Sequence, residues 1–378
     1  MIFSWSSSRG KLDVNQIDVL VCATEAGGAR NLVAVLEEFP ELFQFKVLSG
    51  NGALAIFERS GIPIWRHLPS LGESDAAQIL QETKADIVLC GRGIDKDSLE
   101  RHIIVAARSL GCSTVSIVDE WYDYRANYAD ESGDLVYLPD VVCCPDEQAL
   151  KEAVVEGLPA ECLRVTGSPA LSSLVKKRET YRSNNLSRID EFDRTYPRPF
   201  ITYISEELSD RRPGVSSNDN KSKNISHYDR KDIRNDILQA LLEQFPCCTV
   251  FEKPHPRSES NVCPPINSEN VCWLVIENDE LQDLCWCSDF VIGTKSMGLL
   301  EAALLGTPTV AYQPDPNGNI SCTAVRKGLI PCFHNTDDLK LWFERTRTSA
   351  NKEYILAPDF ARPDAARLVC EVIEEFVS

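Results

Sequence analysis

Short runs of apolar and β-branched residues alternate with longer segments of helical period along most of this chain of 378 residues. Residues 17–23 (IDVLVCA) have the composition of a buried strand, and an amphipathic segment over 29–39 follows them. Such alternation is the sequence form of βαβ units, in which helices cover a parallel sheet. The series predicts one Rossmann-like αβα domain over residues 1–175. Its further strands are expected at 45–48, 62–65, 86–90, 114–118 and 140–144.

A second series of the same kind begins after a polar stretch. Residues 176–198 are poor in apolar side chains, and we interpret them as a helix end and an interdomain linker. Residues 199–378 are then expected to form a second Rossmann-like domain, which suits a chain of this length. Its strands are expected at 200–204, 249–251, 271–276, 290–292 and 309–312, and its helices at 232–244, 281–287, 296–305 and 363–377.

The charge balance excludes one broad class of function. The chain has 39 Lys and Arg residues against 57 Asp and Glu residues, which gives a formal net charge of −18. A general nucleic-acid binder needs a broad positive surface, so nucleic acid is not expected as a partner. The same balance leaves room for a small basic pocket that binds one anionic ligand.

The cellular location is predicted from what the sequence lacks. No run approaches the ~20 apolar residues that cross a bilayer, and residues 1–16 lack the apolar core of a secretion signal. The 15 cysteines lie mostly inside apolar runs, and none of them forms a CxxC pair. We therefore expect reduced, buried thiols in a cytoplasmic protein without a transmembrane segment. A peripheral contact with a membrane stays open.

A long polar stretch, residues 206–230, follows directly after the first strand of the second domain. In open α/β sheets, ligands bind at the carboxyl ends of the strands, so this stretch begins where a ligand is expected. A loop of this length inside a compact domain is usually either a functional lid or disordered. Both alternatives stay open here.

The strongest local signal is the segment from Ile292 to Pro308, in which a buried strand, a small-residue turn and a helix follow one another. Backbone N–H groups at such a helix start, together with the helix dipole, favour phosphate. Glu301 lies in the second helical turn and can accept hydrogen bonds from a ribose diol. The alternative is a plain crossover in which Glu301 faces solvent. The candidate substrate-binding residues of this segment are Gly293, Thr294, Lys295, Ser296, Met297, Gly298 and Glu301.

A second anion-binding signal, Lys253-Pro-His255-Pro-Arg257, follows the strand that ends at Phe251. Two prolines fix the direction of His255, and Lys253 and Arg257 flank it with positive charge, which suits a phosphate group. The alternative is an ordered loop with exposed charges. Ser205, at the end of the first strand of this domain, joins the candidate substrate-binding residues.

The first domain supplies carboxylates for acid–base chemistry. Asp119 and Glu120 follow the strand at 114–118 beside aromatic residues, where desolvation and like charge can raise a pKa. Such a group can act as the general base that takes a proton from a reacting hydroxyl. The alternative places Asp119 in a turn and Glu120 in solvent. In the first βα turn, the candidate substrate contacts are Glu25, Gly27, Gly28 and Arg30.

The segment from Gly293 to Pro314 resembles the nucleotide-binding motif of GT-B glycosyltransferases and UDP-N-acetylglucosamine 2-epimerases. In these families a Gly/Ser turn holds the diphosphate, and a glutamate followed by Ala and a Gly-x-Pro loop holds the ribose. Glu301-Ala302 and Gly306-Thr-Pro308 match that pattern. The resemblance implies an α/β fold with two Rossmann-like αβα domains facing a cleft. It also implies a nucleotide sugar held by the second domain, and a terminal helix that returns toward the first.

A further resemblance concerns the catalytic residues. His255 is similar to the histidine of the HP motif in bacterial sialyltransferases and polyol-phosphate transferases, where it contacts the donor phosphate. Asp119 and Glu120 take the place of the paired acidic residues of the sialyltransferase-like families, although the glycine that usually follows them is Trp121 here. This resemblance implies that Asp119 or Glu120 deprotonates the acceptor while His255 stabilises the leaving phosphate.

Together these features predict a glycosyltransferase that moves a sugar from a nucleotide-sugar donor to a saccharide or other hydroxyl acceptor, without a metal ion or a cofactor. A UDP-sugar 2-epimerase or hydrolase on the same fold is the first alternative. Against it, Gly27-Gly-Ala-Arg30 lacks the proline of the epimerase turn, and Val118-Asp-Glu-Trp-Tyr122 replaces the epimerase His-x-Glu-Ala-Gly stretch. The second alternative is a nucleotide-sugar-binding or partner protein without catalytic activity.

Overall fold

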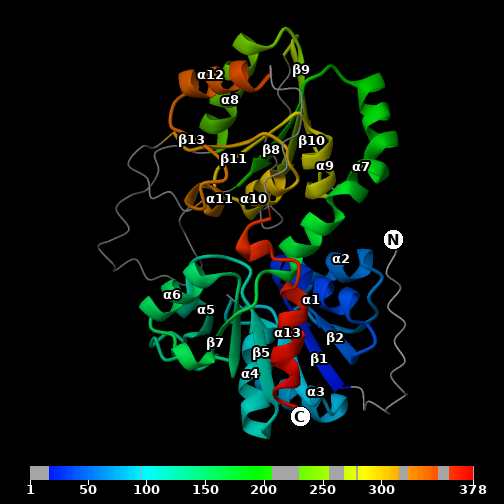
Figure 1. The fold of residues 1–378 in the computed structure, drawn as a ribbon, viewed down its shortest axis with the longest axis vertical. Helices are drawn as coiled ribbons and strands as arrows, with labels where there is room; N and C mark the ends of the chain where they lie inside the picture. The colour runs from blue at the N-terminus through cyan, green and yellow to red at the C-terminus, as the bar shows by residue number, and fades with distance from the viewer. Residues whose placement is uncertain are drawn as a thin grey trace, which may run out of the picture. The chain divides into compact units, whose positions relative to one another are not determined.

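The computed structural model describes residues 17–93, 95–206, 230–254, 268–277, 280–314, 322–347 and 357–377. The chain divides into two compact units: unit 1 is Met1–Ser172 with Asp359–Ser378, and unit 2 is Ser173–Pro358. Each unit contains a parallel sheet whose strands are linked by helices (Figure 1). The prediction of two Rossmann-like αβα domains is therefore confirmed.

Unit 1 contains, within the described residues, a seven-stranded parallel sheet in the order β3-β2-β1-β4-β5-β6-β7. The strand order reverses between β1 and β4, so their carboxyl ends flank the crevice in which such sheets bind ligands. The seventh strand, which the sequence analysis missed, is only three residues long. The strands are β1 Ile17–Ala23, β2 Phe43–Ser49, β3 Ile64–His67, β4 Ile87–Cys90, β5 Ser113–Ile117, β6 Val141–Cys144 and β7 Leu163–Val165.

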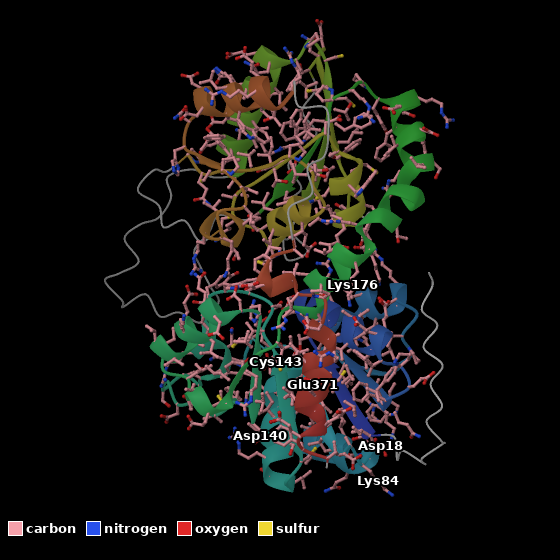
Figure 2. All side chains as sticks on the ribbon, in the orientation of Figure 1. Asp18, Lys84, Asp140, Cys143, Lys176 and Glu371 are labelled. Atoms are coloured by element: carbon pink, nitrogen blue, oxygen red, sulfur yellow. The ribbon has the colours of Figure 1, made fainter. Side chains whose placement is uncertain are left out.

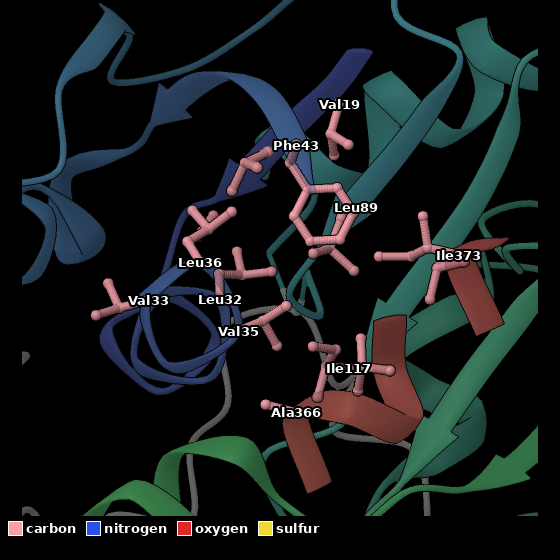
Figure 3. Packing of buried hydrophobic residues seen from close by; sticks show 14 of the residues in the cluster. Val19, Leu32, Val33, Val35, Leu36, Phe43, Leu89, Ile117, Ala366 and Ile373 are labelled. Atoms are coloured by element: carbon pink, nitrogen blue, oxygen red, sulfur yellow. The ribbon is translucent and has the colours of Figure 1, made fainter. Parts of the chain in front are cut away.

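Helices cover both faces of this sheet. The terminal helix α13 (Ala365–Glu374) belongs to unit 1 and packs against α1 (Ala26–Glu38). Figure 3 shows Ala366 and Ile373 of α13 among the buried side chains of β1, β4 and β5. Burial of a large aliphatic side chain contributes about 1.5–3 kcal/mol to the free energy of unfolding. Through its buried side chains, α13 therefore forms part of the hydrophobic core of unit 1. The other helices are α2 Asn51–Arg59, α3 Glu73–Thr83, α4 Leu99–Leu110, α5 Tyr124–Tyr128 and α6 Glu147–Val155.

The amino edge of this sheet is closed by aspartates. Asp140 Oδ2 accepts hydrogen bonds of 2.8 Å from both the backbone N–H and the hydroxyl of Thr114. Asp86 Oδ2 accepts a hydrogen bond from the backbone of Asp18 at 2.9 Å. Figure 2 shows Asp18, Lys84 and Asp140 together at this lower end of unit 1. These aspartates thus satisfy backbone and side-chain donors near the starts of β1 and β5.

Unit 2 contains a six-stranded parallel sheet in the part of the chain that the structure describes, in the order β10-β9-β8-β11-β12-β13. Here the order reverses between β8 and β11, which again marks the expected ligand crevice. The two-residue strand β13 is the only one of these that the sequence analysis did not expect. The strands are β8 Phe200–Ser205, β9 Cys248–Pro254, β10 Val271–Val275, β11 Phe290–Gly293, β12 Thr309–Tyr312 and β13 Cys332–Phe333.

Alternating side chains of β8 face opposite layers of helices. Ile201 and Tyr203 pack in a core shared with α8 and α12, whereas Thr202 hydrogen-bonds Ser288 just after α9, at 2.8 Å. Both faces of the strand are thus buried, which explains its nearly continuous apolar sequence. The helices of unit 2 are α8 Arg230–Gln244, α9 Leu281–Cys287, α10 Met297–Leu304, α11 Thr323–Arg326 and α12 Thr336–Arg347.

Residues 176–198, interpreted from the sequence as a helix end and a linker, lie almost wholly inside one helix, α7 (Pro169–Thr195). Polar contacts hold this helix to α9: the Tyr181 hydroxyl hydrogen-bonds Gln282 at 3.3 Å, and Asn185 Nδ2 donates to Asp283 at 3.1 Å. Phe192 of α7 also packs against Phe200 and Phe251. With most of its other residues polar, the segment lacks the continuous apolar period from which a helix is usually predicted.

Two general expectations can be compared with the structure. No helix among the described residues is long and apolar enough to cross a membrane. The cysteines of the described segments are free thiols, most of them buried, and burial raises the pKa of Cys22, Cys90 and Cys143. A raised thiol pKa keeps the reactive thiolate scarce, so these cysteines act as core residues.

Candidate functional site

In unit 1, three predicted segments meet at the carboxyl edge of the sheet. The turn after β1 carries Glu25, which begins helix α1, and Arg30 lies in the first turns of that helix. Gly28 packs so closely on Gly91, after β4, that an added Cβ would lie 3.0 Å from the Gly91 Cα. The two turns at the point where the strand order reverses are therefore in direct contact.

Asp119 lies against the same turn. A Cβ added at Gly27 would overlap the Asp119 Oδ2 atom, so a side chain at position 27 and this carboxylate cannot both keep their places. The sequence analysis proposed Gly27 and Asp119 as site residues from separate signals, and the structure places them in contact. Glycine is needed here because of this close approach, not because of its backbone conformation.

Replacing Gly27 with Ala is expected to destabilise unit 1 by about 1–3 kcal/mol, since the added methyl overlaps a carboxylate. In an Asp119→Ala background the nearest remaining atom is the Asp119 Cβ, at 3.5 Å, which is ordinary contact. Urea unfolding of both single variants and the double variant measures the coupling. Gly72→Ala, whose added Cβ meets its nearest atom at 3.7 Å, is the control. Additive effects of the two substitutions would contradict the predicted overlap.

Arg92, which the sequence analysis assigned no role, joins Asp119 and Glu120. It follows Gly91 at the end of β4, and its side chain is 4% exposed. The guanidinium Nε donates to Asp119 Oδ1 and one terminal nitrogen donates to Glu120 Oε2. A charged residue directly after a buried strand, between two glycines, was the available signal. Neither alternative for Asp119 and Glu120, a turn cap or a solvated carboxylate, describes this ion-paired cluster.

The burial of Asp119 affects its titration. Burial raises the pKa of Asp119, and the nearby charge of Glu120 acts in the same direction, while Arg92 opposes both. Tyr122 packs beside them, and burial raises its pKa as well, followed by the effect of the Glu120 charge. The neutral phenol can therefore hydrogen-bond Glu120 throughout the physiological pH range.

The tryptophan that replaces the usual glycine after the acidic pair has a structural role. Trp121 is buried, its indole N–H donates to Asp146 Oδ2 at 2.9 Å, and its ring packs edge-on against Phe360. The other oxygen of Asp146 caps helix α6 through the backbone N–H of Ala149 at 2.8 Å. Trp121 thus anchors the loop that carries Glu120.

A second carboxylate missed by the sequence analysis, Glu100, lies fully buried beneath the first turn. Its two oxygens accept hydrogen bonds from the backbone N–H of Thr24 at 2.7 Å and from the Thr24 hydroxyl at 2.5 Å. Burial raises the pKa of Glu100 to about 7, although the Thr24 hydrogen bonds oppose the rise. Between about pH 4.5 and about pH 7, Glu100 is therefore protonated in the folded protein and ionised in the unfolded chain.

This difference predicts a pH-dependent stability. The contribution of Glu100 to the free energy of unfolding is largest below about pH 4.5, and it falls as the pH rises to about 7. The loss is on the order of 3 kcal/mol and is complete above pH 7. Urea unfolding at several pH values between 5 and 8 should therefore show wild type losing stability relative to Glu100→Gln, which has no such proton to release. Parallel pH profiles of the two proteins would contradict the prediction.

In unit 2, the two predicted anion-binding segments begin at the same sheet edge. Lys253 of β9 pairs in register with Ile204 of β8, and Ile204 pairs with Gly293 of β11. Neighbouring strands lie about 4.8 Å apart, so only the width of one strand, β8, separates the ends of β9 and β11. The Lys253 ammonium group donates to the backbone oxygen of Glu277 at 2.5 Å.

The turn after β11 is tied to both of its neighbouring strands. The backbone N–H of Lys295 donates to Glu206 Oε2 at 2.8 Å, directly after β8. Gln313, after β12, donates to the backbone oxygen of Thr294 at 2.8 Å. Glu206, 8% exposed, was missed because the sequence there belongs to a long polar stretch. The Glu206 carboxylate thus already accepts a hydrogen bond from one backbone N–H of the turn that was predicted to bind phosphate.

Ser296 and the two glycines also have structural tasks. The Ser296 hydroxyl oxygen caps α10 by accepting from the backbone N–H of Gly298 at 3.1 Å, which leaves its hydrogen available to donate. A Cβ at Gly298 would overlap side chains of Leu281 and Ile204. One at Gly293 would lie 3.1 Å from Leu299. Both glycines therefore serve close packing of α10, and Met297 begins that helix.

Glu301 is 7% exposed and does not face solvent. Its Oε2 accepts a hydrogen bond from Gln282 of α9 at 2.9 Å. The expectation that Glu301 faces solvent in a plain crossover is therefore wrong, and the ribose-binding role of Glu301 stays a prediction.

Some predicted residues are not covered. His255, Arg257 and positions 207–229 of the proposed lid lie outside the described residues. Among the residues that the structure does describe, no group of three or more His, Cys, Asp or Glu side chains could hold a metal ion.

No protein-family model and no curated protein matches this chain. Solved structures match nearly all of it. The UDP-GlcNAc 2-epimerase from Neisseria meningitidis, bound to UDP-GlcNAc, is 16% identical with a TM-score of 0.64, over 94% of this chain and 99% of that chain. The UDP-GlcNAc 2-epimerase from Rickettsia bellii is 14% identical with a TM-score of 0.65, over 96% and 97%.

A protein from Anabaena in complex with UDP is 12% identical, with a TM-score of 0.55, over 95% of this chain and 100% of that chain. The prediction of a glycosyltransferase is wrong: several of the solved structures that match nearly the whole chain are UDP-GlcNAc 2-epimerases, which supports the first alternative instead. The chain has the two-domain GT-B-type fold that these nucleotide-sugar epimerases share.

Proposed function

We propose that this protein is an enzyme that binds a UDP-sugar and inverts the sugar at carbon 2, with a UDP-N-acetylhexosamine as substrate. The observation that carries the proposal is the match of nearly the whole chain to UDP-GlcNAc 2-epimerases, one of them bound to UDP-GlcNAc. Such an enzyme needs no hydroxyl acceptor, so the acceptor expected from the sequence has no place in the reaction.

Unit 2 provides the groups for the nucleotide. The start of α10 directs backbone N–H groups and the positive end of its dipole out of the edge where the strand order reverses. Lys253 reaches the same edge one strand away, and we include His255 and Arg257 on the basis of the sequence. Because Glu206 already accepts from the backbone N–H of Lys295, we assign the diphosphate to the Ser296 hydroxyl, the start of α10 and these cations, and the ribose to Glu301.

Inversion at carbon 2 requires that a proton leaves one face of the carbon and a proton returns to the other. When the bond from carbon 1 to the diphosphate oxygen breaks, the diphosphate leaves with that electron pair, and the electron pair of the carbon 2–H bond forms a double bond between carbons 1 and 2. A proton then adds to the other face of carbon 2, while the diphosphate oxygen or a water molecule bonds to carbon 1. A titratable side chain must carry the proton. Among the described residues, the Asp119–Glu120 pair suits this task, because its two charges are partly desolvated and only partly balanced by the single charge of Arg92.

Isothermal calorimetry with UDP tests the nucleotide assignment. Lys253→Met should weaken UDP binding about tenfold, because one cation near the diphosphate is lost. Lys340→Met, which breaks an ion pair with Glu243 on the partly exposed face of α12, should leave the affinity unchanged. Equal UDP affinity of wild type and Lys253→Met would remove Lys253 from the site, and failure of wild type to bind UDP would overturn the proposed function.

A further inference from the structure

Arg92 lies between Asp119 and Glu120 in unit 1, and the proposed reaction has so far given this residue no role of its own. Its side chain is 4% exposed, against 12% for Asp119 and 21% for Glu120. It is thus deeper than the carboxylates that it binds. A buried arginine is expensive to desolvate, and it is kept only where good partners compensate.

Each of the three guanidinium nitrogens binds a different side chain. Nε donates to Asp119, one terminal nitrogen donates to Glu120, and the other donates to Asn127 Oδ1 at 3.3 Å. Because the guanidinium is planar and rigid, these three bonds fix the direction of both carboxylates relative to each other. A lysine carries the same charge but cannot reproduce this geometry.

The two carboxylates are not held equally. Asp119 is fixed from both sides, since Oδ1 accepts from Arg92 and Oδ2 lies against Gly27. Glu120 accepts from Arg92 through Oε2 and also hydrogen-bonds Tyr122, but it is the more exposed of the two. The more accessible carboxylate is the one that a substrate proton can reach.

We propose that Arg92 is a positioning residue, which clamps Asp119 and thereby presents Glu120 as the group that exchanges a proton with the substrate. The proposal rests on the proposed 2-epimerase function, because it assigns roles within that reaction. Arg92 itself transfers no proton: burial alone would lower its pKa, but Asp119 and Glu120 more than reverse this, so the guanidinium stays charged.

The electrostatics of the cluster support this division. With both carboxylates ionised the three side chains carry one net negative charge, so the cluster can take up one proton without losing its ion pair. Tyr122 and Tyr128 are also titratable groups near Arg92, and burial raises the pKa of both phenols, so they remain neutral near pH 7. Glu100 is the further carboxyl group beside this turn, since its Oε1 atom would lie 3.5 Å from a Cβ added at Gly91, and burial raises its pKa to about 7.

The test is a pH titration of the side-chain carboxyl carbons by ¹³C NMR in wild type, Arg92→Met and Arg92→Lys, with Asp119→Asn and Glu120→Gln to assign the signals. Removing the cation should move the titration of the pair to higher pH by at least about one unit, since each carboxylate loses an opposite charge. Arg92→Lys should restore the wild-type titration. This readout does not depend on catalytic activity.

Steady-state kinetics with the UDP-sugar complete the test. Arg92→Met should lower kcat about 100-fold with KM within about threefold of wild type, because misplaced reacting groups slow the chemical step and not binding. Arg92→Lys should recover only part of kcat, and Asn127→Ala, which removes the third contact, should lower kcat about tenfold. Asn127→Ala also replaces Arg92→Met if that variant does not fold.

The outcomes separate the two proposals. An unchanged titration and an unchanged kcat in Arg92→Met would overturn the positioning role. A full recovery of kcat in Arg92→Lys would show that charge alone matters and would overturn the geometric argument. If the titration shifts as expected but wild type converts no UDP-sugar, Arg92 organises the carboxylates and the proposed function is the part that fails.

Discussion

Replacing Glu120 with Gln is expected to lower the rate of UDP-sugar epimerisation by about 10²–10⁴-fold, the usual contribution of a general acid–base group. Glutamine keeps the size of the side chain and can still accept from Arg92, but it cannot take up the substrate proton. Unit 2 is untouched, so UDP affinity measured by calorimetry should stay within about threefold of wild type. The measurement is the initial rate of conversion followed by ¹H NMR.

Two further variants define the specificity of this effect. Asp119→Asn should reduce the rate by less than Glu120→Gln, because Asp119 is clamped between Arg92 and Gly27. Glu131→Gln removes an exposed carboxylate that pairs with Lys96 at the surface, and it should have no effect. A rate for Glu120→Gln equal to that of wild type would exclude Glu120 as the proton carrier.

Replacing Arg234 with Met is expected to destabilise unit 2 by about 3–5 kcal/mol, because the buried carboxylate of Glu252 would lose its cation. The Arg234 Nε lies 3.0 Å from Glu252 Oε2, and the two side chains are 5% and 2% exposed. The contact is an ion pair, since the N–H at that nitrogen is not well aligned for a hydrogen bond. Trp273 also donates to this oxygen at 2.7 Å, and its ring lies under the guanidinium.

A surface pair in unit 1 offers a closely matched control. Arg66 lies 2.9 Å from Glu82 and over the ring of Trp65, but the side chains of Arg66 and Glu82 are each more than one-third exposed. Arg66→Met should therefore cost no more than about 1 kcal/mol. Chemical unfolding of the variants measures both effects. Adding Glu252→Gln to Arg234→Met should recover part of the loss, since no buried charge then lacks a partner. Equal costs for Arg66→Met and Arg234→Met would contradict the account.

Much of the fold could be predicted because parallel sheets leave a clear sequence pattern. Most residues of β1, β9 and β12 are buried, and each strand contains an apolar run that the sequence analysis located within a few residues. Several elements were not located from the sequence. β7 and β13 are too short to show a pattern, and α7 is so polar that it has no continuous apolar period.

The candidate site was predicted only in part, because a sequence motif identifies a segment of the chain but not the distant residues that the segment contacts. Asp119 and Gly27 were each singled out, yet their direct contact depends on the order of β1, β4 and β5 in the sheet. Arg92 and Glu206 were missed because each acts through a residue far away in sequence. Arg92 is 27 positions from Asp119, and Glu206 is 89 positions from Lys295.

Incubation of the protein with UDP-GlcNAc in D₂O, followed by NMR and mass spectrometry, tests the central claim most directly. The account predicts that the carbon 2 epimer, UDP-N-acetylmannosamine or the free sugar with UDP, appears with one deuterium at carbon 2. Deuterium must enter there because the proton that leaves is exchanged before a proton returns to the other face. UDP-GlcNAc that remains unconverted, with its carbon 2 proton retained, would contradict the account.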